Sequence, residues 1–489
     1  MFSRIARAAF CVASLIASCE HQALAAITVN TRADTVDDDG VTSLREAITA
    51  ANNQAGDDII NFSVTGTINL TGALPDLSSN IQIHGPGAAS LTVRRNTGGD
   101  YSIFTVVGGP TVVLDGLTIS NGSGTNGGLY GGGIFNDYGG TLTVSNITLS
   151  GNSSDYGGGI LNFGTLTVSN STLLGNSAGS GGGGICNVGT LTVASSTLSG
   201  NFSGYYGGGA VNFYGTATLT NSTLTGNSAV DGGGAANGDT LVLANCTVSG
   251  NSAVFGGGIS TGNYSTLTNC TLTNNSAPEG GGFRNVGYAT LNNTIVANST
   301  LGSDVVNFNY LTGSHNLVED GSGGLLDTIT GDPNLGPLAN NGGLTLTYAL
   351  MTGSPAINAG DNALAIDPLT NAPLTTDQRG LARFVGTVDI GAFEVQTVSP
   401  LTAMHILRNY VLALVDSGIL NKGQGNSLIV KLDGAAQQFL NHKTTPTINK
   451  LQAFINEVKA LVKSKKLSAV DGQFMINLAT DVINELNSP

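Results

Sequence analysis

The sequence predicts a right-handed parallel β-helix followed by a small α-helical bundle, and three patterns support this fold class. A Gly triplet recurs at intervals of 24 to 26 residues through the middle of the chain. Between the triplets, apolar residues alternate with Thr or Ser, as in a strand with one buried face. Beyond residue 400 the apolar residues take up helical spacing instead. The third glycines of the triplets are Gly133, Gly159, Gly184, Gly209, Gly234, Gly258 and Gly282.

One repeat, GGGILNFGTLTVSNSTLLGNSA, runs from Gly157 to Ala178 and shows how a turn would be built. Leu166 and Val168 should point into the core and Thr167 to solvent, because side chains alternate along a strand. Like residues should then stack on like residues, about 4.8 Å apart. Helical and leucine-rich repeats are excluded, since the units are rich in Gly and Thr and lack a Leu-spaced consensus. We expect regular turns over residues 131–299 of a β-helix that spans residues 63–330.

Asparagines recur in two columns of the repeat. An inward Asn can hydrogen-bond to the Asn above and below it, and Asn also tolerates the left-handed backbone of sharp corners. Both columns are therefore expected at turns that face the core. The first column is Asn146, Asn170, Ser195, Asn221, Asn245, Asn269 and Asn293, and the second is Asn152, Asn176, Asn201, Asn227, Asn251 and Asn275.

Charge is sparse and unevenly distributed. Only 10% of the 489 residues are charged and the net charge is −14, which argues against a nucleic-acid partner because phosphate binding needs clustered Lys and Arg. The first Lys is Lys422, and half of the 18 basic residues follow Pro400. This shift predicts a separate helical domain over residues 397–489. No apolar run after the N-terminus is long enough to span a membrane.

Residues 1–25 have the pattern of an export signal. A basic start precedes the apolar residues 8–18, a stretch too short to cross a bilayer. Cleavage after Ala25 fits the Ala-Leu-Ala sequence there. A second interpretation stays open, because the Ile-Ala-Ser-Cys sequence ending at Cys19 resembles a bacterial lipobox and would place a lipid anchor on Cys19. With either fate, the mature protein leaves the cytoplasm.

Residues 26–62 are expected to close the N-terminal end of the β-helix with a short helix. Ser43 and Glu46 have the spacing of a capping box. The apolar face behind them would plug the open end, where a bare turn would expose unpaired backbone groups. That face consists of Leu44, Ala47, Ile48 and Ala51.

An acidic turn before this helix is a candidate Ca²⁺ site. Counting Thr35 as the first position, Asp37, Asp39 and Glu46 fall at positions 3, 5 and 12 of an EF-hand-like loop. Thr35 is a poor first ligand, and the capping box by itself accounts for Glu46. The metal site therefore competes with a purely structural explanation.

A stripe of aromatic residues is the candidate binding surface. Tyr130, Tyr156, Tyr206 and Phe255 each directly precede a Gly triplet. Rings in one column of a rod can stack on sugar faces or on another protein. The alternative is that they stack on their neighbours over the corners, which aromatic geometry also favours.

The sequence assigns no catalytic residue. Acidic residues are scattered through the repeats, and Asp231 and Glu279 share a column two turns apart, hence about 9–10 Å. Arg284 is the single basic residue of the regular turns. A polysaccharide lyase needs a carboxylate cluster for Ca²⁺ and a base, and an inverting hydrolase needs paired carboxylates. The pattern favours a surface without a catalytic groove.

Two segments in the first part of the chain resemble families of exported bacterial proteins. Residues 42–47, Thr-Ser-Leu-Arg-Glu-Ala, resemble the N-terminal segment known for a Cys-Ser-Leu-Arg-Glu-Ala motif, with Thr42 in place of the Cys. The Gly-Gly-Gly-Ile and Leu-x-x-Asn marks of the repeat resemble the Gly-Gly-Ala-Ile and Phe-x-x-Asn marks of chlamydial polymorphic outer-membrane proteins. Those proteins end in a membrane domain, whereas this chain ends in helices.

The last part of the chain carries two further resemblances. Residues 331–396 contain Gly-Ser-Pro-Ala-Ile, Asp-Gln-Arg-Gly and Asp-Ile-Gly-Ala-Phe-Glu, and are similar to the choice-of-anchor Q region of bacterial surface proteins. We expect them to form the last irregular turns and the C-terminal cap. Residues 397–489 resemble the FIMAH module of secreted bacterial proteins. Together the resemblances imply export and a pectin-lyase-like solenoid, and they imply little about function.

These features predict a non-catalytic scaffold, secreted or held at the cell surface or outer membrane of a bacterium. The expected partner is a polysaccharide or a cell-surface protein, with no cofactor beyond the candidate Ca²⁺. The alternative is a pectin-lyase-like polysaccharide lyase or glycoside hydrolase with its groove in the irregular flanks.

Overall fold

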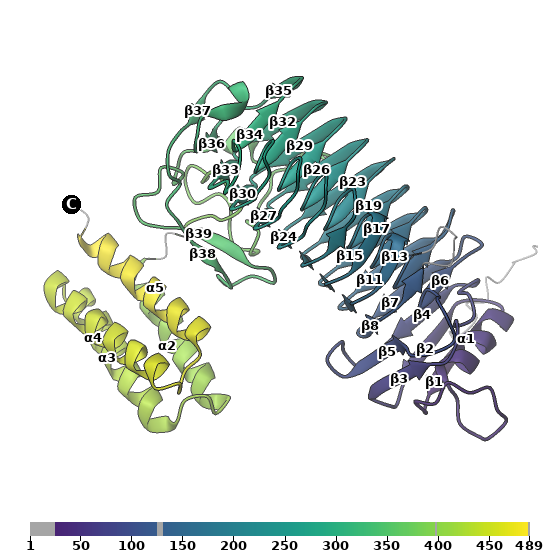
Figure 1. The fold of residues 1–489 in the computed structure, drawn as a ribbon. Helices are drawn as coiled ribbons and strands as arrows, with labels where there is room; N and C mark the ends of the chain where they lie inside the picture. Colours follow the sequence, from purple (N-terminus) through teal and green to yellow (C-terminus); the bar gives the residue numbers. More distant parts are fainter. Residues whose placement is uncertain (1–24, 125–130, 397–398, 488–489) are drawn as a thin grey trace, which may run out of the picture.

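The computed structural model describes residues 25–124, 131–396 and 399–487. The proposed export signal with Cys19, and the aromatic candidate Tyr130, lie outside the described residues. The described chain forms a right-handed parallel β-helix, drawn as a rod of stacked strands in Figure 1, and a group of helices follows it. The predicted fold class is confirmed.

Three parallel sheets form the sides of the rod, and a short fourth one lies at a corner. Sheet A contains β1 (Ala25–Val29), β2 (Asp58–Phe62), β4 (Ile81–His84), β7 (Thr111–Asp115), β11 (Thr141–Ser145), β15 (Thr165–Ser169), β19 (Thr190–Ala194), β23 (Thr216–Thr220), β26 (Thr240–Ala244), β29 (Tyr264–Thr268), β32 (Tyr288–Asn292) and β35 (Tyr310–Thr312). Sheet B contains β3 (Gly66–Leu70), β5 (Leu91–Arg95), β8 (Thr118–Ser120), β12 (Thr148–Ser150), β16 (Thr172–Leu174), β20 (Thr197–Ser199), β24 (Thr223–Thr225), β27 (Thr247–Ser249), β30 (Thr271–Thr273), β33 (Ile295–Ala297), β36 (Asn316–Val318) and β37 (Thr328–Ile329). Sheet C contains β6 (Phe104–Val106), β10 (Ile134–Asn136), β14 (Ile160–Asn162), β18 (Ile185–Asn187), β22 (Ala210–Asn212), β25 (Ala235–Asn237), β28 (Ile259–Thr261), β31 (Phe283–Asn285) and β34 (Val305–Asn307). The short sheet contains β9 (Ser123–Gly124), β13 (Ser153–Tyr156), β17 (Ser177–Gly181) and β21 (Phe202–Ser203).

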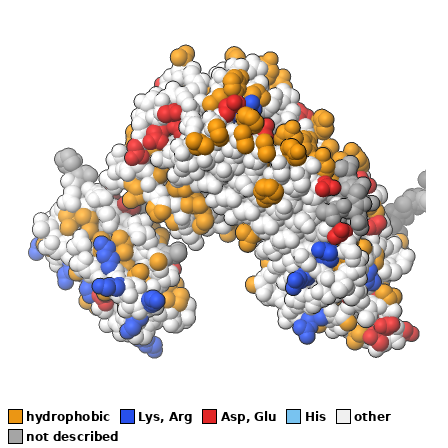
Figure 2. All heavy atoms as spheres, in the orientation of Figure 1, with side chains coloured by type: hydrophobic (Ala, Val, Ile, Leu, Met, Phe, Trp, Pro, Cys, Tyr) orange, Lys and Arg blue, Asp and Glu red, His pale blue; other side chains and the backbone are white. Residues whose placement is uncertain are grey.

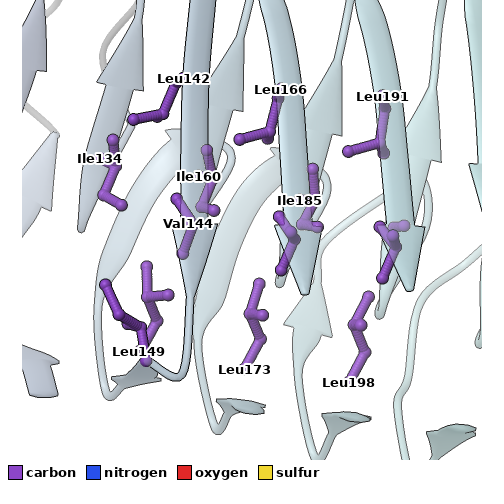
Figure 3. Close-up of a cluster of buried hydrophobic side chains, with 14 of the residues drawn as sticks. Ile134, Leu142, Val144, Leu149, Ile160, Leu166, Leu173, Ile185, Leu191 and Leu198 are labelled. Carbon is purple, nitrogen blue, oxygen red and sulfur yellow. The ribbon is translucent and has the colours of Figure 1, made fainter. Parts of the chain in front are cut away.

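The core consists of columns of like apolar residues, as the repeat predicts. Leu166 pairs in register with Leu142 on one side and Leu191 on the other. Figure 3 shows these three side chains stacked along the inside of sheet A. Leu166 and Val168 are fully buried, while Thr167 between them faces outward. Burial of such columns is the main stabilising contribution, at about 25 cal/mol for each Å² of apolar surface.

The second Asn column forms the predicted ladder inside the rod. Its members are buried, and each side-chain amide donates to the side-chain oxygen of the next Asn at 2.9 to 3.0 Å. Asn201, for example, also donates to the carbonyl of Leu173 at 3.0 Å. The ladder therefore satisfies the buried amides of Asn152, Asn176, Asn201, Asn227 and Asn251.

The first Asn column occupies corners, and the expectation that it faces the core is wrong. Asn146 and Asn170 are exposed, with φ of 53° and 48°. Asn side chains reduce the cost of this left-handed backbone, which explains the column without any ladder. Asn245, Asn269 and Asn293 are buried only because residues from the end of the chain cover them.

The Gly triplet forms a corner with no room for side chains. Gly157 has φ of 62°, and a Cβ on Gly159 would lie 2.5 Å from the carbonyl oxygen of Gly184 in the next turn. This packing requires glycine and lets sheet C begin directly at the corner.

Helix α1 (Leu44–Asn53) covers the N-terminal end of the rod, and its predicted apolar face is buried in the main core. The capping box of Ser43 and Glu46 is present. Arg45 forms an ion pair with Asp34 at 2.9 Å. Burial alone would raise the pKa of Asp34, but hydrogen bonds from Arg45 and Thr71 outweigh it and hold the pKa below its usual range. The motif that resembles Cys-Ser-Leu-Arg-Glu-Ala thus has a structural role at each of these positions.

Residues 331–396, named here the side segment, lie along the flank of the rod and do not continue its stack. They contain β38 (Leu335–Ala339) and β39 (Thr347–Leu350), an antiparallel pair, and the short helix η2 (Asn362–Leu364). Gln378 accepts from Thr247 at 2.6 Å, and Tyr348 contacts Ser249 at 2.7 Å. The segment thereby covers the outer face of sheet B, whose Thr and Ser hydroxyls supply its hydrogen bonds. The short helix η1 (Ser322–Gly324) belongs to the rod itself, where it connects β36 to β37.

Buried charges hold the side segment together. Arg383 is fully buried and donates to Glu394 at 3.3 Å and to the Asn245 side chain of the solenoid at 2.8 Å. Arg379 pairs with Asp377 at 2.6 Å, with its guanidinium 3.6 Å from the centroid of the Phe393 ring. The Asp-Gln-Arg-Gly and Asp-Ile-Gly-Ala-Phe-Glu motifs are therefore structural clamps.

Glu394 should make the attachment of the side segment sensitive to pH. Burial, and then the nearby Asp389, raise the pKa of Glu394 from 4.5 to about 8, although Arg383 opposes the shift. Between these pH values the folded state holds a proton that the unfolded segment has lost, so stability should fall as pH rises. Hydrogen exchange of the side segment at about pH 4.5 and about pH 8 measures this. Glu394→Gln should flatten the difference, and an unchanged difference would contradict the assignment.

Four helices after the solenoid form a bundle with its own apolar core. Helix α2 packs against α3 and α5, and α4 packs against the same two helices. Their bounds are α2 (Pro400–Asp416), α3 (Lys422–Leu440), α4 (Thr444–Lys463) and α5 (Ala469–Asn487). None of the helices among the described residues has the length and apolar character that a membrane crossing requires.

Candidate functional site

An unusual outer face on sheet C is the candidate functional site. Each of its strands has three residues, and the middle residue points away from the core. Middle residues of successive strands pair in register, and they are Phe135, Leu161, Cys186, Val211, Ala236, Ser260 and Arg284. Most of them are nevertheless buried and form an apolar cluster separate from the core. Side chains from both flanks must therefore cover this column, named here the floor.

Two rims flank the floor and make it an outer groove. The first rim is the column that precedes the Gly triplets, and it consists of Tyr156, Gly181, Tyr206, Asp231, Phe255 and Glu279. The second rim follows the third residue of each strand, and it consists of Phe163, Val188, Phe213, Gly238, Gly262, Val286 and Phe308. Figure 2 shows apolar side chains in a band along the rod, with acidic side chains and a basic one among them.

The predicted aromatic stripe falls on the first rim. Tyr156, Tyr206 and Phe255 share its column, with Gly181 and Asp231 between them. Their rings do not stack on one another directly. Tyr156 and Tyr206 instead meet the edge of Phe213, from the opposite rim, with centroids 6.1 Å and 5.8 Å away.

Phe213 closes the groove where it reaches across to the first rim. It lies over the position of Gly181, where a Cβ would come within 3.0 Å of the Phe213 ring. On the N-terminal side of this point the groove is filled, since Phe163 packs against Phe135 with centroids 5.9 Å apart. In this half of the groove the Phe163 ring packs on the floor residue Phe135.

A hollow of about 330 Å³, named here the outer pocket, opens on the other side of Phe213. Its floor is reduced to Ala236 and Ser260, and its second rim to Gly238 and Gly262. Two consecutive turns therefore lack large side chains in both columns. The pocket exists because four small residues coincide in register.

Arg284 bounds the far side of the outer pocket. Its guanidinium lies 5.1 Å from the Phe255 ring centroid and 5.6 Å from that of Phe308, and it is paired with Glu279. On the near side, Asp231 lines the pocket and has one carboxylate oxygen that is buried without a hydrogen-bond partner among the described residues. The pocket thus combines aromatic walls with an acceptor at one end and a guanidinium at the other.

The charged groups of the outer pocket lie at its two ends. The groove does bring Asp231, Glu279 and Arg284 together, which the sequence had left as a coincidence of column. The ion pair with Glu279 fixes the Arg284 guanidinium as a hydrogen-bond donor. Asp231 supplies an acceptor, because one of its buried carboxylate oxygens has no partner among the described residues.

Two residues of the candidate Ca²⁺ site, Asp39 and Glu46, take part in local hydrogen bonds. Both carboxylate oxygens of Glu46 accept backbone hydrogen bonds, from Asp37 at 2.9 Å and from Ser43 at 2.7 Å. Asp39 accepts from the backbone of Val41 at 3.1 Å. Within the described ranges, no group of three or more His, Cys, Asp or Glu side chains is placed to hold a metal ion.

The chain is a parallel β-helix with a hollow on its outer face. Comparisons with known proteins add a likeness of fold. No family model and no curated protein matches the sequence. Among solved structures, the chain is similar to the A-module of the mannuronan C-5 epimerase AlgE4 from Azotobacter vinelandii. The match has 14% identity and a TM-score of 0.35, and covers 62% of this chain and 93% of that module. A likeness this distant implies nothing about activity.

Proposed function

We propose that this chain is a non-catalytic β-helix scaffold that binds a glycan in the outer pocket. The observation that carries the proposal is the coincidence of aromatic walls, an unpartnered carboxylate oxygen and a fixed guanidinium around one hollow. Its volume of about 330 Å³ lies at the scale of small-ligand pockets. A protein partner would need a much wider face, roughly 800 Å² on each side.

The scaffold is further proposed to be exported by a bacterium, as its N-terminal pattern and segment resemblances suggest. The uniform turns then supply a rigid support that displays the pocket. The helical bundle, with most of the Lys residues, would serve as a separate interaction or anchoring module.

The alternative function is a polysaccharide lyase or glycoside hydrolase. It is favoured by the presence of Asp231 and Glu279 in the groove that holds Arg284. Incubating the full chain with neutral and acidic polysaccharides separates the two functions, because binding without new reducing ends or unsaturated products supports the scaffold. Turnover that is lost in Asp231→Asn would support the enzyme.

Filling the floor should abolish binding without unfolding the protein. Ser260→Leu places in the floor column the residue that Leu161 contributes four registers earlier, so the column can accept it. We expect glycan affinity to fall by about tenfold or more, equivalent to about 1.4 kcal/mol. Isothermal titration calorimetry measures the affinity and thermal unfolding checks the fold.

Thr167→Leu is the matched control for this variant. It adds the same side chain at an outward position of sheet A, away from the groove. Affinity should stay unchanged in the control. If both variants bind glycan as well as the original protein, the outer pocket is not the binding site.

A further inference from the structure

The outer groove is barred at both ends of the outer pocket, and this limits what can enter it. On one side Phe213 reaches the opposite rim at Tyr206, with ring centroids 5.8 Å apart. On the other side the Arg284 guanidinium lies between Phe255 and Phe308, at 5.1 Å and 5.6 Å from their centroids. These two obstructions, Phe213 and Arg284, are named here the bars, and each one spans the groove from the first rim to the second. The open floor between them is Ala236 and Ser260.

The spacing of the bars leaves room for only a short ligand. The floor residues Val211 and Arg284 are three registers apart, which corresponds to about 14 Å along the rod. A polymer lying along the axis would have to displace Phe213, which packs against two tyrosines, or break the ion pair of Arg284 with Glu279. A ligand that enters from the side and stops in the pocket displaces neither.

Resting on the proposed function, we infer that the outer pocket takes the terminal sugar residues of a neutral glycan and not an internal stretch of a polymer. The rings of Tyr206 and Phe213 offer apolar surface to the sugar. The bars set the depth to which the chain end enters. The pocket is therefore specific for glycan ends.

The charges of the pocket select a neutral sugar. Residues 131–299 contain five acidic residues and one basic residue, a net charge of −4, and Glu279 already pairs with that base. The acidic residues are Asp137, Asp155, Asp231, Asp239 and Glu279. A uronate would face Asp231 and Glu279 with no unpaired cation to neutralise it, which disfavours binding.

Neutral hydroxyl groups match the polar atoms that remain. The buried oxygen of Asp231 requires a hydrogen-bond donor, and a sugar hydroxyl supplies one. Arg284 gives its Nε hydrogen to Glu279, and its two terminal nitrogens make no hydrogen bond to another described residue. These can donate to a hydroxyl or ring oxygen. A ligand with both donors and acceptors satisfies the two ends of the pocket at once.

Titration of the full chain with length series of oligosaccharides tests this inference. The probes are gluco-, xylo- and manno-oligosaccharides from disaccharide to hexasaccharide, with oligogalacturonates as the acidic series. We expect at least one neutral series to bind with an affinity that stops rising at a disaccharide or trisaccharide. The acidic series should bind at least about tenfold more weakly. Polymer binding should scale with the number of chain ends, not with mass.

Two variants open the bars and test the geometry directly. Arg284→Ser removes one bar and places a serine in the floor next to Ser260, one register away. Phe213→Ala removes the other bar. In either variant the ratio of hexasaccharide to disaccharide affinity should rise, while Arg284→Ser, which also removes a donor, should lower the affinity for every length. Thermal unfolding checks each fold. Affinity that already rises steadily to the hexasaccharide in the original protein would overturn the end-binding inference, and tighter binding of the acidic series would overturn its neutral specificity. If no glycan binds, the proposed function itself fails.

Discussion

Replacing Asn201 with Ala is expected to lower the free energy of unfolding of the solenoid by about 3 to 5 kcal/mol. The Asn201 amide donates to Leu173 and to the Asn227 side chain, both at 3.0 Å. Its side-chain oxygen accepts from the backbone and side chain of Asn176 at 2.9 Å and 3.0 Å. The site is fully buried, so each polar group left unpaired costs about 1 to 3 kcal/mol. Guanidinium unfolding followed by circular dichroism measures the loss.

Asn170→Gly provides the matched control. Asn170 belongs to the preceding repeat and lies at an exposed corner with φ of 48°, and glycine keeps that backbone without strain. We expect a change within about 0.5 kcal/mol. Equal destabilisation by the two substitutions would show that the ladder contributes no more than the corner.

The two Asn columns also show what the repeat period can and cannot predict. The period places equivalent residues above one another, so the stacking of Leu166 on Leu142 follows directly from it. It does not reveal which of two Asn columns faces inward. Asn satisfies buried polar groups in one column and left-handed backbone in the other, so the same residue recurs for different physical reasons.

The outer pocket depends on positions where large side chains are absent. Tyr206 and Phe255 stand out in the sequence and were correctly placed in one column. The pocket itself comes from Ala236 and Ser260 between them and the second rim. Small residues give no signal of a pocket in the sequence alone. Their importance becomes clear only when strand register aligns Ala236 and Ser260 with Val211 and its neighbours, which have larger side chains. A register-based alignment of the repeats, column by column, could have found this signal.

The position of the side segment could not be predicted from the repeat. Thr247 and Ser249 have the pattern of solvent-facing strand residues, identical to that of earlier turns. In the structure they bind Gln378 and Tyr348, which follow them by 131 and 99 residues. A hydroxyl that hydrogen-bonds to water and one that hydrogen-bonds to a distant segment occur in the same sequence pattern. Local periodicity therefore cannot predict this contact.

Replacing Arg383 with Met is expected to weaken attachment of the side segment by about 3 to 5 kcal/mol. Arg383 is fully buried and donates to Gly391, Ala392 and Glu394 of the segment and to Asn245 of the solenoid. Methionine fills much of the volume but leaves these acceptors unpaired in a dry environment. Limited proteolysis should then cut residues 331–396 while the solenoid remains intact. Arg94→Met, at an exposed arginine, should leave the cleavage pattern unchanged.

A double variant separates the charge of Arg383 from its packing. Above about pH 8 Glu394 is ionised, and the experiment is run there. Removing one partner of a buried ion pair is then costly because the other charge stays behind, whereas replacing both by apolar residues is often nearly neutral. Arg383→Met with Glu394→Leu should therefore recover most of the protection that Arg383→Met loses. Recovery would identify the unpaired carboxyl group as the main source of the instability. If the double variant is cut as readily as the single one, the hydrogen bonds from Arg383 to Asn245 and the segment carbonyls hold the side segment in place, and the ion pair does not.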